Sequence, residues 1–227
     1  MFVMGKEDQI LVVDKNYLFE EYGEFFGFIS HDTYDFESKI LCPEKYYFTR
    51  RGTPEENPSI SAEANVNLKQ PIRYVVIVNP NLKKIFAFRR KSMKEDPTKV
   101  ENRLAGKWSW GAGGHIEQCD HSNDGNLIHS SMNREIGEEV EFVGGSITKV
   151  LPLGYVNEDD DVGKVHFGIL YLLETDATEV RPKQEFNVAR FHSLNELKSI
   201  LSDPELVVEG WSKIAFDPLK KYFAKLN

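Results

Sequence analysis

The segment from Leu127 to Val140 constrains the fold more than any other part of the chain. Apolar residues recur at every fourth position within it, namely Ile128, Met132, Ile136 and Val140. On a helix that turns about 100° per residue, this spacing places them along one face. The segment is therefore predicted to be a helix that packs this face against other elements. Asp124 is its predicted N-cap, and Gly144-Gly145 is predicted to end it.

The same segment carries three carboxylates within one turn. Glu135, Glu138 and Glu139 stand at spacings i, i+3 and i+4, so they share a face. Like charges this close cost roughly a few tenths of a kcal/mol per pair on an exposed helix. Water compensates them on a fully exposed face, whereas a docked helix favours a divalent cation. Mg²⁺ or Mn²⁺ is the expected ion, because both prefer oxygen ligands.

Strands and helices are predicted in mixed order along the rest of the chain. The expected strands lie at 10–13, 72–78, 84–88, 146–155, 164–173 and 188–191, and further helices at 194–201 and 208–226. An Asn79-Pro80 turn joins the second and third strands into a hairpin. This order predicts an α+β fold, an α/β/α sandwich with a mixed sheet between helices.

A polar stretch suggests how the chain is organised. Thr53 to Gln70 contains two prolines and no periodicity, so it is predicted to be an exposed loop or linker. We expect residues 1–68 to form an N-terminal extension packed on the core. Residues 69–227 are expected to form the main domain.

Composition excludes several classes of protein. The net charge of −8 argues against a nucleic-acid polymer as partner, because such proteins need a basic surface. Cys42 and Cys119 match no zinc or redox spacing, which favours free thiols. No signal peptide and no membrane span are expected from the opening residues or from any apolar run. A cytoplasmic protein, with a homodimer as a fair expectation, follows.

The glutamate segment resembles the Nudix box, whose pattern is G-x5-E-x7-R-E-U-x-E-E-x-G-U with U aliphatic. Arg134-Glu-Ile-Gly-Glu-Glu matches R-E-U-x-E-E, and Gly114 resembles the opening glycine. Lys69 to Tyr74, Gly113 to Ile116, and Gly154 to Asn157 with Val162 to Gly168 are similar to a MutT-type subgroup described as phosphoesterases. The resemblance covers about residues 70 to 227.

This resemblance implies a Nudix-like fold and a metal-dependent hydrolase. The substrate would be a small molecule with a diphosphate linkage, such as a nucleoside diphosphate joined to another moiety. The implied metal ligands are Glu135, Glu138, Glu139 and the Gly113 carbonyl. Arg134 joins the implied catalytic set, and so does an acid from a later loop. Glu185 is the candidate for that acid, with the acidic run 158–161 as its rival.

Other side chains could contact a substrate. Arg90, Arg73 and Arg51 are candidates for binding phosphate, although each could be an ordinary surface or strand-end charge. Trp108 and Trp110 could stack on a base or pack in the core. The three histidines His115, His129 and His166 have no evident partner and are not expected to form a site.

Three departures from the box keep other functions open. The loop after Gly114 is about six residues too long, Asn126 replaces the first glutamate, and Glu141 replaces the late glycine. Glu117 is a candidate substitute for the missing glutamate. One alternative is a Nudix-fold ligand-binding or regulatory module with little catalysis. Another is isomerisation of an isoprenoid diphosphate, which would require Cys119 to act in the site.

Overall fold

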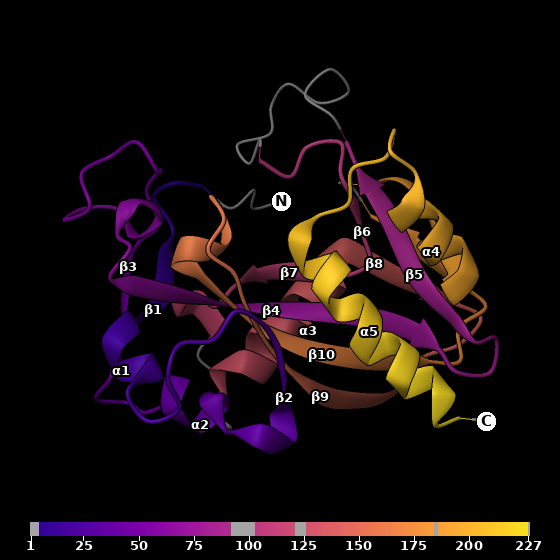
Figure 1. Cartoon of the computed structure of the whole chain (residues 1–227), viewed down its shortest axis with the longest axis horizontal. Coiled ribbons are helices and arrows are strands. Elements are labelled where there is room, and N and C mark those ends of the chain that lie inside the picture. Colours follow the sequence, from indigo (N-terminus) through magenta and orange to yellow (C-terminus); the bar gives the residue numbers. More distant parts are fainter. Residues whose placement is uncertain (1–4, 92–102, 121–125, 184–185, 227) are drawn as a thin grey trace. The chain divides into compact units, whose positions relative to one another are not determined.

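A computed structural model of the chain describes residues 5–91, 103–120, 126–183 and 186–226 (Figure 1). The chain divides into two compact units, each assembled from three stretches of sequence. The first unit contains Met1–Arg73, Gly113–Arg134 and Gly154–Ile169. The second unit contains Tyr74–Ala112, Glu135–Leu153 and Leu170–Asn227.

Strands account for most of the regular structure. They are β1 (Gln9–Asp14), β2 (Gly27–Ser30), β3 (Tyr46–Arg50), β4 (Leu68–Asn79), β5 (Lys84–Arg90), β6 (Trp108–Ser109), β7 (Ala112–His115), β8 (Val140–Val143), β9 (Ile147–Asn157), β10 (His166–Thr175), β11 (Glu179–Pro182) and β12 (Phe186–Ser193). Among the described residues, ten strands form one sheet with the central order β12-β5-β4-β10-β9-β2, and β11 pairs with β8.

Five α-helices and four 3-10 helices are found in the described parts of the chain. The α-helices are α1 (Lys15–Phe19), α2 (Phe36–Ile40), α3 (Leu127–Glu139), α4 (Leu194–Ser202) and α5 (Gly210–Ala224). The 3-10 helices are η1 (His31–Thr33), η2 (Ala62–Ala64), η3 (Gln118–Asp120) and η4 (Gly163–Val165). A large mixed sheet with helices confirms the predicted α+β class. No helix of the described residues is long and apolar enough to cross a membrane.

In the first unit, β1 pairs with two other strands. It lies antiparallel to β3, with Ile10 opposite Thr49, and to the start of β4, with Val13 opposite Lys69. The apolar run 10–13 is fully buried, as its β-branched residues favour. β2 pairs with the end of β9. An aromatic cluster fills this part of the core, made of Phe19, Phe25, Phe36, Tyr155 and Phe167.

In the second unit, β5 has three partner strands. It pairs antiparallel with β4, β6 and β12. The β4–β5 pair is the hairpin predicted around Asn79-Pro80, with Val78 opposite Ile85. Helix α5 lies against the part of β4 in this unit (Figure 1), where the Tyr74 hydroxyl is hydrogen-bonded to Ser212 Oγ at 2.5 Å.

Helix α3 confirms the prediction from apolar spacing. Ile128, Met132, Ile136 and Val140 are all buried. The predicted N-cap Asp124 lies outside the described residues. Asn126 occupies a capping position, because its Oδ1 accepts a hydrogen bond from the His129 backbone N–H at 3.0 Å.

The exit of α3 differs from the prediction. The helix ends at Glu139 and the chain continues at once into β8, so Gly144-Gly145 ends a strand rather than the helix. Gly144 has φ +68°, a left-handed conformation that suits glycine after this strand. Glu141, which replaces the late glycine of the box, lies in β8 opposite Arg181.

The prediction that Thr53 to Gln70 is an exposed loop was partly wrong. Ser61, Glu63 and Gln70 are buried, and Leu68 already belongs to β4. Their polarity concealed this burial, because buried polar side chains need specific partners that a hydropathy pattern does not reveal. The boundary between residues 68 and 69 remains a prediction.

The other predicted elements are found close to their expected positions. The strands predicted at 146–155, 164–173 and 188–191 correspond to β9, β10 and β12. The two C-terminal helices correspond to α4 and α5.

Helix α4 begins with a capping box whose contribution should depend on pH. The Glu196 carboxylate accepts a hydrogen bond from the Ser193 N–H at 2.7 Å, which lowers its pKa to about 2. A carboxylate with a lowered folded pKa stabilises the fold above its unfolded pKa and loses that effect as the pH falls through the folded value. Glu196→Gln should therefore cost about 1 kcal/mol at pH 7.

Urea unfolding of both proteins between pH 7 and pH 3 checks this. The difference between them should shrink below about pH 4.5, the unfolded pKa of glutamate. Glu205→Gln, at an exposed position after α4, is the matched control and should leave the stability unchanged. A difference that stays constant over the whole range would contradict this role for the carboxylate.

Candidate functional site

The three box glutamates lie at the C-terminal end of α3. Glu138 is exposed, whereas Glu135 and Glu139 are half-buried. The apolar face of the helix fixes their orientation, since Ile136 and Val140 on that face are buried. The helix therefore presents an exposed carboxylate at Glu138, with two half-buried ones beside it that lie closer to its packing surface.

Lys183 completes the C-terminal end of this helix. Its backbone N–H donates to the Glu139 carbonyl at 2.8 Å, and its Nζ donates to the Gly137 carbonyl at 2.5 Å. A cation at a helix C-terminus is favourable because the last carbonyls have no partners within the helix. The segment after β11 thus holds the turn of α3 that carries the glutamates.

Arg134 lies one turn before Glu138 and forms a forked pair with Asp120. Its Nε donates to Oδ1 at 2.7 Å and its Nη2 to Oδ2 at 2.9 Å. The Glu117 carboxylate lies 3.3 Å from the same Nη2. Asp120 is buried and also accepts a hydrogen bond from the Glu117 N–H at 2.8 Å. Arg134 therefore fastens α3 to the loop that follows β7.

This arrangement accounts for two departures from the box. Glu117 was the predicted substitute for the missing first glutamate, and its side chain does reach Arg134. Asp120, in η3, makes the shorter contacts and was not anticipated. Its only signal in the sequence was its place in the lengthened loop, three residues after Glu117. Asn126, in the position of the lost glutamate, caps α3 instead.

Most of the glycine-rich segment 111–114 lies in a strand. Ala112 to His115 form strand β7, in which Gly113 is half-buried. Gly111 lies against the Tyr74 ring, and a Cβ at this position would overlap that ring. The absence of a side chain at Gly111 therefore permits close packing in the second unit.

A buried polar network surrounds this Tyr74 ring. The Tyr74 hydroxyl is hydrogen-bonded to the Glu209 carboxylate, and Ser109 Oγ donates to the same oxygen at 2.7 Å. Burial, together with the Glu209 charge, raises the pKa of Tyr74 well above its ordinary value. This network connects β4, β6 and the start of α5.

The two tryptophans near the glycines belong to the core. Trp108 and Trp110 are both buried, and Trp110 packs on Phe216 of α5. The third tryptophan, Trp211, makes an edge-to-face contact with Tyr74. Of the two readings of Trp108 and Trp110, the packing role is the one that the structure supports.

The three candidate phosphate-binding arginines each contact other residues of their own unit. Arg51 Nε donates to Glu63 at 3.0 Å, and buried Arg73 donates to the His115 carbonyl at 3.2 Å. Arg90 lies 3.8 Å from Glu209. Their role in binding phosphate stays a prediction.

Of the two candidates for an additional acid, the run 158–161 lies among the described residues. Glu185 lies outside the described residues. In the rival run, Asp160 Oδ1 accepts hydrogen bonds from the backbone N–H groups of Val162 and Gly163. That acidic run therefore includes a turn stabilised by its own aspartate.

Both cysteines are free thiols, as expected. The Cys119 thiol is exposed and lies 3.7 Å from Glu117. Burial of its sulfur and the charges of Asp120 and Glu117 raise its pKa, which opposes formation of a reactive thiolate. The isomerase alternative gains no support from this environment.

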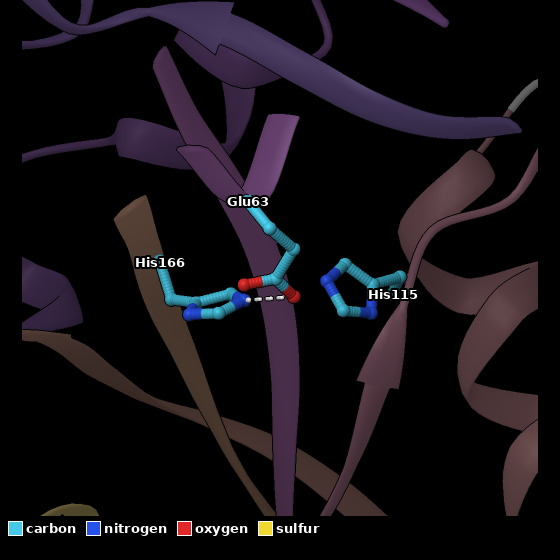
Figure 2. A group of neighbouring side chains, drawn as sticks. All are labelled: Glu63, His115 and His166. Atoms are coloured by element: carbon cyan, nitrogen blue, oxygen red, sulfur yellow. Dashed lines mark ion pairs between the residues drawn. The ribbon is translucent and has the colours of Figure 1, made fainter. Parts of the chain in front are cut away.

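A second group of chemically capable side chains lies within the first unit. Glu63 of η2, His115 of β7 and His166 of β10 each place a ligand-type atom within 4.8 Å of the other two, and all are buried (Figure 2). The expectation that His115 and His166 have no partner was wrong. About fifty residues separate each of the three from the next along the chain, so no short sequence motif contains them.

The electrostatics of this cluster depend on burial and on neighbouring charges. Burial alone would raise the pKa of the Glu63 carboxyl, but the facing His166 ring and the nearby Arg51 charge hold it well below its usual value. Burial lowers the pKa of His115 well below the ordinary histidine value, as does the positive Arg51. Glu63 is thus an anion facing a neutral His115.

The comparisons with known proteins agree with the Nudix resemblance. The chain is 30% identical to Protein YmaB of Bacillus subtilis (strain 168) over 223 residues, which is 96% of this chain and 100% of YmaB. The crystal structure of Tm1382, a candidate Nudix hydrolase, superposes with a TM-score of 0.70 at 27% identity. That match covers 95% of this chain and all of Tm1382.

More distant structures share the fold only. A NUDIX hydrolase from Alicyclobacillus acidocaldarius gives a TM-score of 0.52 at 14% identity, covering 70% of this chain and 93% of its own. The NUDIX domain of Shewanella oneidensis NrtR, complexed with ADP ribose, gives 0.50 at 12% identity, covering 68% and 88%. No protein-family model matches the chain.

The Arg134–Asp120 pair should contribute strongly to stability. Asp120→Asn keeps the size of the side chain but removes the charge that faces a half-buried guanidinium. We expect a loss of about 3 kcal/mol in the free energy of unfolding, as when one partner of a buried ion pair is removed. Urea unfolding at pH 7 measures it.

The control for this substitution is Asp161→Asn. Asp161 pairs with Lys164 at 3.4 Å, but its side chain is 94% exposed. An exposed pair contributes about 0.5 kcal/mol at most. Equal losses for the two variants would mean that the Asp120 pair does not hold α3.

Proposed function

Because the chain belongs to the Nudix superfamily, we propose that it is a divalent-metal-dependent hydrolase that cleaves a diphosphate linkage. The proposed substrate is a small molecule in which a nucleoside diphosphate, or a related phosphorylated group, is joined to another moiety. Mg²⁺ or Mn²⁺ is the proposed ion. This function rests on the box glutamates and on their setting in α3.

One observation carries the proposal. Glu135, Glu138 and Glu139 lie within one turn of a helix whose apolar face is buried, and Glu138 is exposed. Three carboxylates held this closely repel one another, and an ion with oxygen ligands relieves that repulsion. The donor set therefore fits Mg²⁺ or Mn²⁺ better than a metal that prefers nitrogen or sulfur.

The chain's own residues would divide the work as follows. Glu138 and Glu139 would hold the ion, with Glu135 as a further ligand or as the base that takes a proton from the attacking water. The Gly113 carbonyl of β7 is the proposed fourth protein ligand. When bound, the ion would neutralise the diphosphate and lower the pKa of a water molecule near it. Glu185 is a second candidate for the base.

Arg134 is a positioning residue in this scheme. Its guanidinium is occupied by Asp120 and Glu117, so it would act by fixing the helix that carries the glutamates. Carboxylates that must hold an ion lose catalytic power when their support shifts by even about 1 Å. The loop after β7 and the box helix would thus act as one rigid support.

The nucleotide-like character of the proposed substrate is based on one structural neighbour. The NrtR NUDIX domain is a distant relative in fold whose structure contains ADP ribose. Nudix specificity depends on loops and pocket walls rather than on the shared fold, so the substrate must be found by screening. ADP ribose, dinucleotides, nucleotide sugars and nucleoside triphosphates are the compounds to test.

The decisive experiment measures phosphate or nucleotide release across this panel with Mg²⁺, with Mn²⁺ and with a chelator. The parent should turn over at least one compound only when metal is present. Glu138→Gln should lower kcat by about a hundredfold or more, since it removes one charged ligand of the ion. Loss of turnover in the chelator, restored by added metal, is part of the expected result.

Glu141→Gln is the matched control for this experiment. Glu141 is an exposed glutamate three residues after Glu138, but it lies in β8, at the position where the box has a glycine and no ligand. Its substitution should leave turnover unchanged. Absence of turnover on every compound, together with ligand binding that needs no metal, would instead favour a binding module.

A further inference from the structure

Glu63, His115 and His166 come from three separate stretches of the first unit. Glu63 belongs to η2, His115 ends β7, and His166 begins β10. Their side chains are 2%, 5% and 4% exposed. Figure 2 shows the Glu63 carboxylate between the two imidazole rings, with a nitrogen of each ring turned toward it. Burying a carboxylate and two imidazoles is costly unless each polar atom is satisfied.

The His166 ring is fixed in a definite orientation. Its Nδ1 lies 2.5 Å from the Val162 carbonyl oxygen, which can only accept, so Nδ1 carries the proton and donates. In the neutral ring, Nε2 then presents a lone pair to Glu63. Histidines that ligate metals in proteins show this pattern, in which the second ring nitrogen donates to a carbonyl or carboxylate.

The distance between His166 and Glu63 is informative. Nε2 lies 3.6 Å from Oε1 of Glu63, which is too long for a hydrogen bond. Two ligands that each lie about 2.1 Å from a tetrahedral ion are roughly 3.4 Å apart. The separation is that of an ion pair when the ring is protonated, and it also matches two ligands of one cation when the ring is neutral.

Gln70 adds an oxygen beside His115. Its Oε1 lies 2.7 Å from His115 Nε2, and both side chains are buried. The Gln70 amide nitrogen is also buried and has no hydrogen-bond partner among the described residues. The amide oxygen thus accepts a hydrogen bond from a protonated Nε2, which leaves Nδ1 of the neutral His115 ring as its ligand atom.

The positive charges around the cluster determine which cation can bind. Arg51 donates to Glu63 at 3.0 Å, and Arg73 donates to the His115 carbonyl at 3.2 Å. With one guanidinium on the single carboxylate and a second on the His115 backbone, net negative charge cannot supply the affinity. Bonds to imidazole nitrogen must supply it, which selects zinc over magnesium or calcium.

We propose that Glu63, His115 and His166 bind a Zn²⁺ ion in a structural site that is separate from the glutamates of α3. All three proposed ligands are buried, so the ion would be shielded from solvent, as in a site that stabilises the fold. Bound zinc would connect η2 of the N-terminal segment to β7 and β10. The proposal does not depend on the proposed hydrolase activity.

A competition titration on the full chain tests the site. Metal-stripped protein is titrated with Zn²⁺ against a chromophoric chelator, in excess Mg²⁺ so that the α3 glutamates are occupied. The parent should bind one equivalent, and zinc should raise its thermal midpoint. His166→Gln and Glu63→Gln should each weaken binding by at least about a hundredfold, the upper end of the cost of losing a supporting partner.

His192→Gln is the matched control. His192 is also buried and lies 3.9 Å from a glutamate, Glu196, but it belongs to the second unit and, among the described residues, to no such cluster of three. It should bind zinc as the parent does. Zinc binding that persists in His166→Gln and Glu63→Gln, or a parent that binds no stoichiometric zinc, would overturn the proposal.

X-ray absorption spectroscopy of the zinc-loaded parent identifies the ligands of the ion directly. This test does not require any variant to fold. The proposed site predicts two imidazole nitrogens and at least one oxygen at about 2.0–2.2 Å from the ion. A spectrum that contains oxygen ligands alone would place the zinc on carboxylates and overturn the assignment. Loss of the imidazole signal in His115→Gln, with retention in Glu138→Gln, would support it.

Discussion

The two hydrogen bonds from the Arg134 guanidinium to the Asp120 carboxylate are the interaction on which the α3 site depends. A helix fixed only by its apolar face can slide or rotate slightly, because hydrophobic contacts have little directionality. The planar guanidinium of Arg134 limits this movement, because its two hydrogen bonds to the Asp120 carboxylate fix the orientation of one group relative to the other. The glutamates follow in the next turn of the same helix, so their position derives from this pair.

Sequence patterns predicted those elements that are defined by residues close together in the sequence. The apolar spacing of Ile128, Met132 and Ile136 identified α3, and β-rich runs around Asn79-Pro80 identified the β4–β5 hairpin, because these signals lie within one element. Partners far apart in sequence could not be found in this way. Asp120 lies in a loop without regular pattern, and His115 and His166 meet Glu63 only after the chain has folded.

The N-terminal segment contributes more buried side chains than its polarity suggested. Glu63 contacts Arg51 and faces His166, while Lys69 donates to the backbone carbonyls of Gly163 and His166. Burial lowers the pKa of Lys69 to about 8, a cost that its two carbonyl partners offset in part. Residues 53–70 therefore contribute buried, hydrogen-bonded side chains to the first unit, even though their composition resembles that of a loop.

The positions of the tryptophans make the intrinsic fluorescence of the protein specific to one of its two units. Trp108, Trp110 and Trp211 are its three tryptophans, and all belong to the second unit. Indole emission therefore reports the surroundings of β6 and α5, whereas the backbone ellipticity in the far ultraviolet reports both units together. Coincident transitions from the two signals would mean that the units unfold as one cooperative body. Separate transitions would show each unit losing its structure at its own denaturant concentration, with the indoles following the second.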